Sequence, residues 1–104
     1  MTDEHLTALL AERVMGWSVG PDRFMTGNRG WLSHWRFQPA EKLADALRLL
    51  EVAGPEEYSL RGDSEGNSRV HVRIGDATGE ACCSSKPRAI TCAIARAVGI
   101  EVEP

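Results

Sequence analysis

The sequence predicts an α+β domain in which three helices pack on a small antiparallel sheet of three to four strands. Apolar residues recur with helical spacing in three segments of the chain. Between the second and the third segment the apolar period changes to two, the spacing of half-buried strands. The expected order is helix, loop, helix, three strands, helix, within a single domain of residues 1–104.

The first two helices are predicted from apolar stripes and from residues that begin or end a helix. The stripe of the first helix consists of Leu6, Leu9, Leu10 and Val14, with Thr2 or Asp3 as its cap and Gly16 as its stop. The second helix lies within residues 40–54, where Leu43, Ala46, Leu47 and Leu50 share one face. Pro39 suits its entry, and Gly54-Pro55 ends it.

The strands come next and are joined by short turns. EYSLR places Tyr58 and Leu60 inward, and RVHVRI alternates Val70, Val72 and Ile74 with Arg69, His71 and Arg73. DSEGN and GDATG have hairpin-loop composition, so EACCSS follows as a third strand of an antiparallel meander. The last helix begins in SSKPRAITCAIARAVG, with Ser84 or Ser85 as its cap and Gly99 as its stop. Its stripe is Ile90, Ala93, Ile94, Ala97 and Val98.

Composition restricts the class of protein and its compartment. The formal net charge of −3 argues against a general nucleic-acid coat protein, because such proteins carry basic surfaces. The three cysteines, Cys82, Cys83 and Cys92, are odd in number and lack the spacing of a disulfide framework, which indicates a reducing compartment. The chain has no long apolar run and starts without the basic residues of a secretory signal, so we expect a cytoplasmic protein.

Three blocks of the chain, LTALLAERVMGW, FQPAEKLADALRLLE and AITCAIARAVG, resemble in order and spacing the small phage proteins of the phage ABA-sandwich domain family. The resemblance implies a phage or prophage origin, the cytoplasm of an infected or lysogenic bacterium, and a helix–sheet–helix sandwich. It implies no activity and no catalytic residues. Residues 18–36 are longer than the usual link between the first two blocks, and the Arg69, His71, Arg73 face is more polar than a covered sheet face.

The segment GWSVGPDRFMTGNRGWLSHWRF, residues 16–37, holds all three tryptophans and both phenylalanines. It also holds three arginines against one acid, Asp22. Arginines beside indoles can hold a phosphate while the ring stacks on a base, or the rings can simply fill the core. We expect Trp17 to be structural, and leave both interpretations open for Trp31 and Trp35.

A second basic group lies on the strand that carries His71. Its side chains could receive a phosphate, or they could form a solvated face paired with Glu57 or Glu80. The candidate ligand-binding residues of the whole chain are Arg29, Trp31, His34, Trp35, Arg36, Arg69, His71 and Arg73.

Metal and catalytic chemistry find little support in the sequence. His5, His34 and His71 lie far apart, and Cys82-Cys83 lacks the gap of a zinc knuckle, so we expect no metal and no cofactor. Cys92 falls in a helical stripe and reads as a small core residue. The chain has no nucleophile elbow, P-loop or H-E-x-x-H motif, and we expect no enzyme.

Two main hypotheses and one further possibility remain for the function of a non-enzymatic phage accessory protein. The first is binding of a small anionic ligand, such as a cyclic nucleotide used as an immune signal by the host. The alternative is a protein–protein modulator, for example a counter-defence inhibitor of a host defence protein, that docks through the aromatic segment. A structural accessory of the virion is a third possibility. A homodimer or higher homo-oligomer is compatible with all three.

Overall fold

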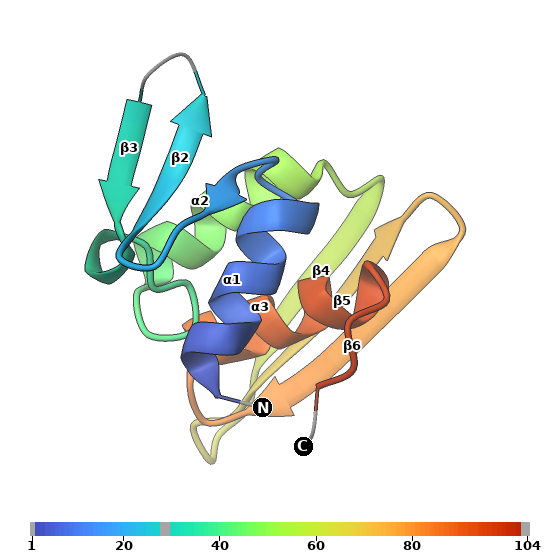
Figure 1. Cartoon of the computed structure of the whole chain (residues 1–104). Helices are drawn as coiled ribbons and strands as arrows, with labels where there is room; N and C mark the ends of the chain where they lie inside the picture. Colours follow the sequence, from blue (N-terminus) through green and yellow to red (C-terminus); the bar gives the residue numbers. More distant parts are fainter. Residues whose placement is uncertain (1, 28–29, 103–104) are drawn as a thin grey trace.

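The computed structural model describes residues 2–27 and 30–102, and it folds these residues into three helices and two antiparallel sheets (Figure 1). The elements are α1 (Asp3–Arg13), β1 (Ser18–Val19), β2 (Arg23–Gly27), β3 (Gly30–Ser33), η1 (His34–Arg36), α2 (Leu43–Ala53), β4 (Glu57–Gly62), β5 (Ser68–Ile74), β6 (Ala77–Cys83) and α3 (Lys86–Ala97). The predicted α+β class, with three helices and an antiparallel meander of three strands, is confirmed.

The larger sheet has the order β4-β5-β6, and α3 covers β5 and β6. Val70 and Val72 of the central strand are fully buried beneath this helix. Gly79 of β6 lies directly under α3, where an added Cβ would overlap the carbonyl oxygen of Ala93. A glycine is required here because the backbones of helix and strand approach each other so closely.

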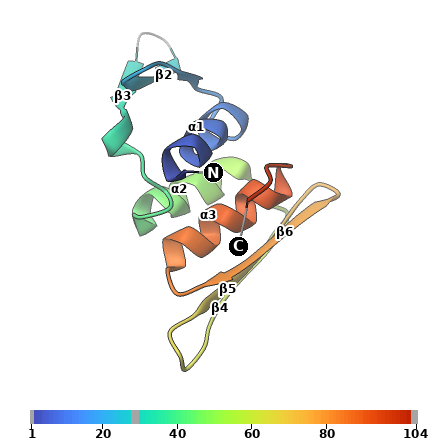
Figure 2. The same ribbon diagram turned by 60° about the horizontal axis from the view of Figure 1, so that its bottom comes forward.

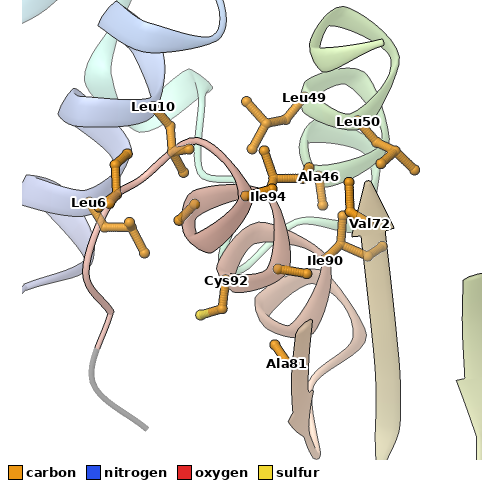
Figure 3. Packing of buried hydrophobic residues seen from close by; sticks show 14 of the residues in the cluster. Leu6, Leu10, Ala46, Leu49, Leu50, Val72, Ala81, Ile90, Cys92 and Ile94 are labelled. Carbon is orange, nitrogen blue, oxygen red and sulfur yellow. The ribbon is translucent and has the colours of Figure 1, made fainter. Parts of the chain in front are cut away.

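Helices α1 and α2 complete the core on the side of α3 that faces away from the sheet. Figure 3 shows Leu50 of α2 close to Val72, whereas Leu49 points toward Leu10 of α1. All of these side chains are buried, together with Ile94 of α3. One hydrophobic cluster therefore joins the larger sheet to all three helices.

The helix ends decide between the predicted caps. The Thr2 hydroxyl accepts a hydrogen bond from the His5 amide at 3.1 Å, and the Ser85 hydroxyl accepts one from the Arg88 amide at 3.4 Å. Gly54 ends α2 in the left-handed conformation, with φ of +59°. Of the alternative caps that the sequence left open, Thr2 is therefore the cap of α1 and Ser85 is the cap of α3.

The segment expected to be a loop forms a second sheet, β1-β2-β3, followed by the short 3₁₀ helix η1. Figure 2 shows β2 and β3 beyond α1, on the opposite side of the helices from β4–β6. The sandwich therefore has its helices in the middle. The outer face of β5 carries Arg69, His71 and Arg73, and none of the described helices or strands covers it, as its polarity indicates.

Two details of side-chain orientation differ from the sequence expectation. Leu43 and Leu47 of α2 are exposed, and Leu49 is buried instead, because α2 turns Ala46, Leu49 and Leu50 toward its neighbours. Tyr58 and Leu60 pair with Val72 and Val70, and so face the helix side of the sheet as expected. They nevertheless stay 59% and 40% exposed. The close packing of α3 falls on β5 and β6, and β4 lies at the margin of the helical layer.

No helix within the described residues is long and apolar enough to span a membrane.

Candidate functional site

The aromatic segment divides into an inner cluster and an outer face. Trp17, Phe24 and Phe37 meet in the inner cluster, where the ring centroids of Trp17 lie 5.7 Å from Phe24 and 5.1 Å from Phe37. All three side chains are buried. The prediction that Trp17 is structural is confirmed, and this cluster fixes the smaller sheet on the helices.

The outer face follows from strand alternation in the smaller sheet. Phe24 of β2 pairs with Leu32 of β3 on the inner side, so Met25 and its partner Trp31 point outward. Trp31 is 57% exposed, and Trp35 of η1 is 61% exposed. Of the two interpretations of these tryptophans, core packing is therefore wrong.

An arginine guanidinium group lies over the ring of each exposed tryptophan. The guanidinium carbon of Arg23 lies 4.9 Å from the Trp31 ring centroid, and that of Arg36 lies 5.1 Å from the Trp35 centroid. We call Arg23, Met25, Trp31, Trp35 and Arg36 together the aromatic face. Trp31 projects from the outer side of the smaller sheet, whereas Trp35 lies on the adjoining η1 and also lines the cleft described below. A guanidinium group over an exposed indole face is attracted to it by about 0.5–1 kcal/mol.

Asp22 holds Arg23 in place. Its carboxylate lies 3.2 Å from Nε of Arg23 and accepts two hydrogen bonds from the guanidinium. These hydrogen bonds lower the pKa of Asp22 and raise that of Arg23. At neutral pH the pair is fully ionised, and the charge of Arg23 is largely compensated.

A cleft of about 790 Å³ opens next to Trp35, between the start of α1 and the chain around η1. Its lining includes four carboxylates, Asp3, Glu4, Asp22 and Glu41, with His34 as the one basic ring among its residues. Hydrogen bonds from Arg88, at 2.9 and 2.6 Å, lower the pKa of Asp3. Asp3 and Asp22 are thus already paired with Arg88 and Arg23, and among the described residues Glu4 and Glu41 are the cleft carboxylates that form no salt bridge. The excess negative charge of the cleft comes from these two groups, and it favours a cationic group over an anion.

His34 packs beneath the cleft, against the aromatic cluster. Its ring stacks on Phe24 with 4.5 Å between centroids, and its buried Nε2 has no hydrogen-bond partner within the described residues. It contributes one wall of the cleft beside Trp35.

The predicted ligand-binding residues do not form one site. Trp31, Trp35 and Arg36 lie on the aromatic face, and His34 lies beneath it. The three basic residues of β5 lie on the outer face of the other sheet, with the helices in between (Figure 2). Arg29 falls outside the described residues.

The β5 group is a partly paired face, as one of the two interpretations expected. Arg73 lies 3.0 Å from Glu57 and 3.2 Å from Glu56, and His71 is in register with Glu80. The sequence analysis did not place Arg23 and Met25 in the candidate site. The alternation of RFM and GWLS on either side of a glycine-containing turn could have indicated them.

The three cysteines are among the residues that line a smaller cavity of about 350 Å³. All three are free, and burial raises the pKa of the Cys92 thiol. Cys92 is a core residue, as predicted. Among the residues that the structure describes, no group of three or more histidine, cysteine or acidic side chains could hold a metal ion.

The fold defines a small α+β sandwich protein. The family model of the phage ABA sandwich domain matches residues 8–97, and the chain belongs to this family. A phage protein from Bacillus cereus ATCC 14579, known from its crystal structure, is similar in fold with a TM-score of 0.81 and 17% sequence identity. The likeness covers 99% of this chain and 93% of that one. No curated protein matches the sequence.

Proposed function

We propose that this phage protein acts without catalysis, by docking on another protein through its aromatic face. The observation that carries the proposal is the exposure of two tryptophans that each lie against an arginine, Trp31 on the smaller sheet and Trp35 on the adjoining η1, next to the aromatic cluster that anchors this part of the chain to the core. Tryptophan and arginine are the residues that most often dominate binding energy in protein interfaces.

The acidic cleft adds a charge preference. Trp35 belongs both to the aromatic face and to the lining of the cleft, so one partner could cover both. An arginine or lysine side chain of the partner would enter among the carboxylates while an apolar surface covers the indoles. The partner we propose thus presents an apolar patch with a basic residue at its rim, and in a phage context it is a protein of the host cytoplasm, such as a defence protein.

The same observations weigh against a small anionic ligand at this place. Arg23 is already paired with Asp22, and the lining of the adjacent cleft includes Glu4 and Glu41, which form no salt bridge within the described residues. At Arg23 and in the cleft, a nucleotide phosphate would therefore meet compensated or repulsive charge, which leaves Arg36 as the cation of the aromatic face that could receive it. The basic strand β5 lies on the other sheet and has no tryptophan of the segment beside it.

Affinity capture from host lysate, followed by calorimetry with the purified captured protein, tests the docking proposal. Trp31→Ala and Trp35→Ala should each weaken binding by about thirtyfold, since a hot-spot residue contributes roughly 2 kcal/mol. Val52→Ala truncates another exposed apolar side chain, on α2 and outside the aromatic face, and should leave the affinity unchanged.

A thermal-shift panel of linear and cyclic nucleotides tests the competing ligand hypothesis. We expect no dose-dependent shift. A shift of about 10 °C at a hundredfold excess over Kd, lost in Arg36→Ala, would replace the docking proposal with a nucleotide-binding function.

A further inference from the structure

The free edge of β4 is the least protected backbone of the larger sheet. Every residue of β4 (Glu57–Gly62) is exposed, and among the residues that the structure describes the strand pairs with β5 alone. The opposite edge is different, because the Arg96 guanidinium donates to the Glu80 carbonyl of β6 and to the Val102 carbonyl of the C-terminal segment. Exposed strand edges with apolar side chains invite pairing with another chain.

The hairpin geometry identifies which backbone groups face this free edge. The Asp63 amide donates to the Asn67 carbonyl at 3.0 Å, next to the register pair Gly62 and Ser68. Because hydrogen-bonded pairs alternate along an antiparallel ladder, the odd-numbered residues of β4 direct their N–H and C=O groups toward β5. Tyr58 and Leu60 therefore direct theirs outward.

The side chains of β4 are complementary to those of a second, antiparallel copy. If Ser59 of one chain lies opposite Ser59 of the other, Tyr58 and Leu60 of each chain exchange backbone hydrogen bonds with Leu60 and Tyr58 of the second. On the outer face the same register places Glu57 opposite Arg61, twice. Shifting the register by two residues places Glu57 opposite Ser59 or Asp63, which loses both charge pairs.

The pairing between two copies also compensates a repulsion between like charges in the single chain. Arg61 lies directly opposite Arg69 of β5, and like charges at such positions are destabilising. Its one acidic neighbour in the paired sheet would be Glu57 of the second copy, which already holds Arg73 of its own chain at 3.0 Å. The row across the two chains then reads Arg73, Glu57, Arg61, Arg69.

We propose that two copies of this chain pair through β4 in this register to form a two-fold dimer with one continuous six-stranded sheet. On the helix side, Tyr58 and Leu60 of both chains cover one another, which buries apolar surface that the single chain leaves exposed. The aromatic face lies beyond the helices and stays accessible, so this dimer is independent of the docking proposal.

Sedimentation velocity between about 1 and 100 μM, with native mass spectrometry of mixtures, tests the dimer. The wild-type chain should be a dimer whose Kd rises with salt concentration. Glu57→Arg and Arg61→Glu each oppose like charges twice, and should raise the Kd by about tenfold to a hundredfold. Mixing these two variants restores both opposite-charge pairs and should give a heterodimer. Glu80→Arg, a matched reversal on the other edge strand, should stay dimeric.

Amide hydrogen exchange of the wild-type chain gives a readout that needs no variant. The Tyr58 and Leu60 amides should be protected, and their protection should fall on dilution below the Kd. A wild-type chain that is monomeric at 100 μM overturns the proposal. It is equally overturned by single reversals that leave the dimer intact, or by a dimer whose Tyr58 and Leu60 amides exchange freely.

Discussion

Replacing Gly79 with alanine tests the close contact on which the larger sheet and α3 depend. The new Cβ would overlap the Ala93 carbonyl oxygen and lie 2.5 Å from the Ala97 amide nitrogen. Both neighbours are backbone atoms of α3, so no side-chain rotamer can relieve the overlap, and the helix itself must move. Overpacking a core costs about 1–3 kcal/mol, and we place Gly79→Ala near 3 kcal/mol because a whole helix is displaced.

For a chain of about 100 residues, this cost lowers the Tm by roughly 12–24 °C. Thermal unfolding followed by circular dichroism measures it. Gly62→Ala is the matched control, since Gly62 is also a strand glycine but an added Cβ would have its nearest neighbour at 4.0 Å. It should leave the Tm within a few degrees of wild type. Equal Tm values for Gly79→Ala and Gly62→Ala would refute the packing argument.

Three further predictions concern charge, thiols and tryptophan. Arg88 lowers the pKa of Asp3, so this pair stabilises the fold above the ordinary carboxyl pKa of 3.8 and loses the contribution as the pH falls through the lowered pKa of the folded state. Asp3→Asn should therefore cost about 0.5 kcal/mol at pH 7, after allowance for solvent screening, and almost nothing near pH 2, measured by urea unfolding. A thiol reagent at pH 7.5 should modify the exposed Cys82 at once and the buried Cys92 only after unfolding; equal rates would contradict the assigned burial. Trp17→Phe should leave acrylamide quenching of fluorescence almost unchanged, whereas a large loss of quenching would mean that Trp17 is the accessible indole.

The sequence predicts those elements whose own residues determine them. The third helix combines a Ser cap, a proline in the first turn and a regular apolar stripe. In the structure the helix begins after Ser85, and its apolar stripe is buried, as expected. The strand with Val70 and Val72 alternates cleanly because one of its faces is buried and the other is solvated.

The rest depends on contacts that local patterns do not encode. The stripe of α2 admits two faces, and only its packing against α1 and α3 selects Leu49 over Leu47. Strands β1 and β3 have two and four residues, too few for alternation to stand out. Because the second sheet was not predicted, the sequence analysis could not determine whether Trp31 and Trp35 point inward or outward. It also grouped these tryptophans with basic residues that the fold places on the other sheet.

The central claim is that the aromatic face binds a protein. The measurement that tests it most directly is quantitative capture from host lysate by the wild-type chain, by the double variant Trp31→Ala/Trp35→Ala, and by Val52→Ala, with calorimetry on the captured protein. We predict one protein that binds the wild-type chain and Val52→Ala equally and the double variant at least a hundredfold more weakly. A partner held equally by all three chains, or calorimetry that shows no binding to the wild-type chain, would contradict the claim.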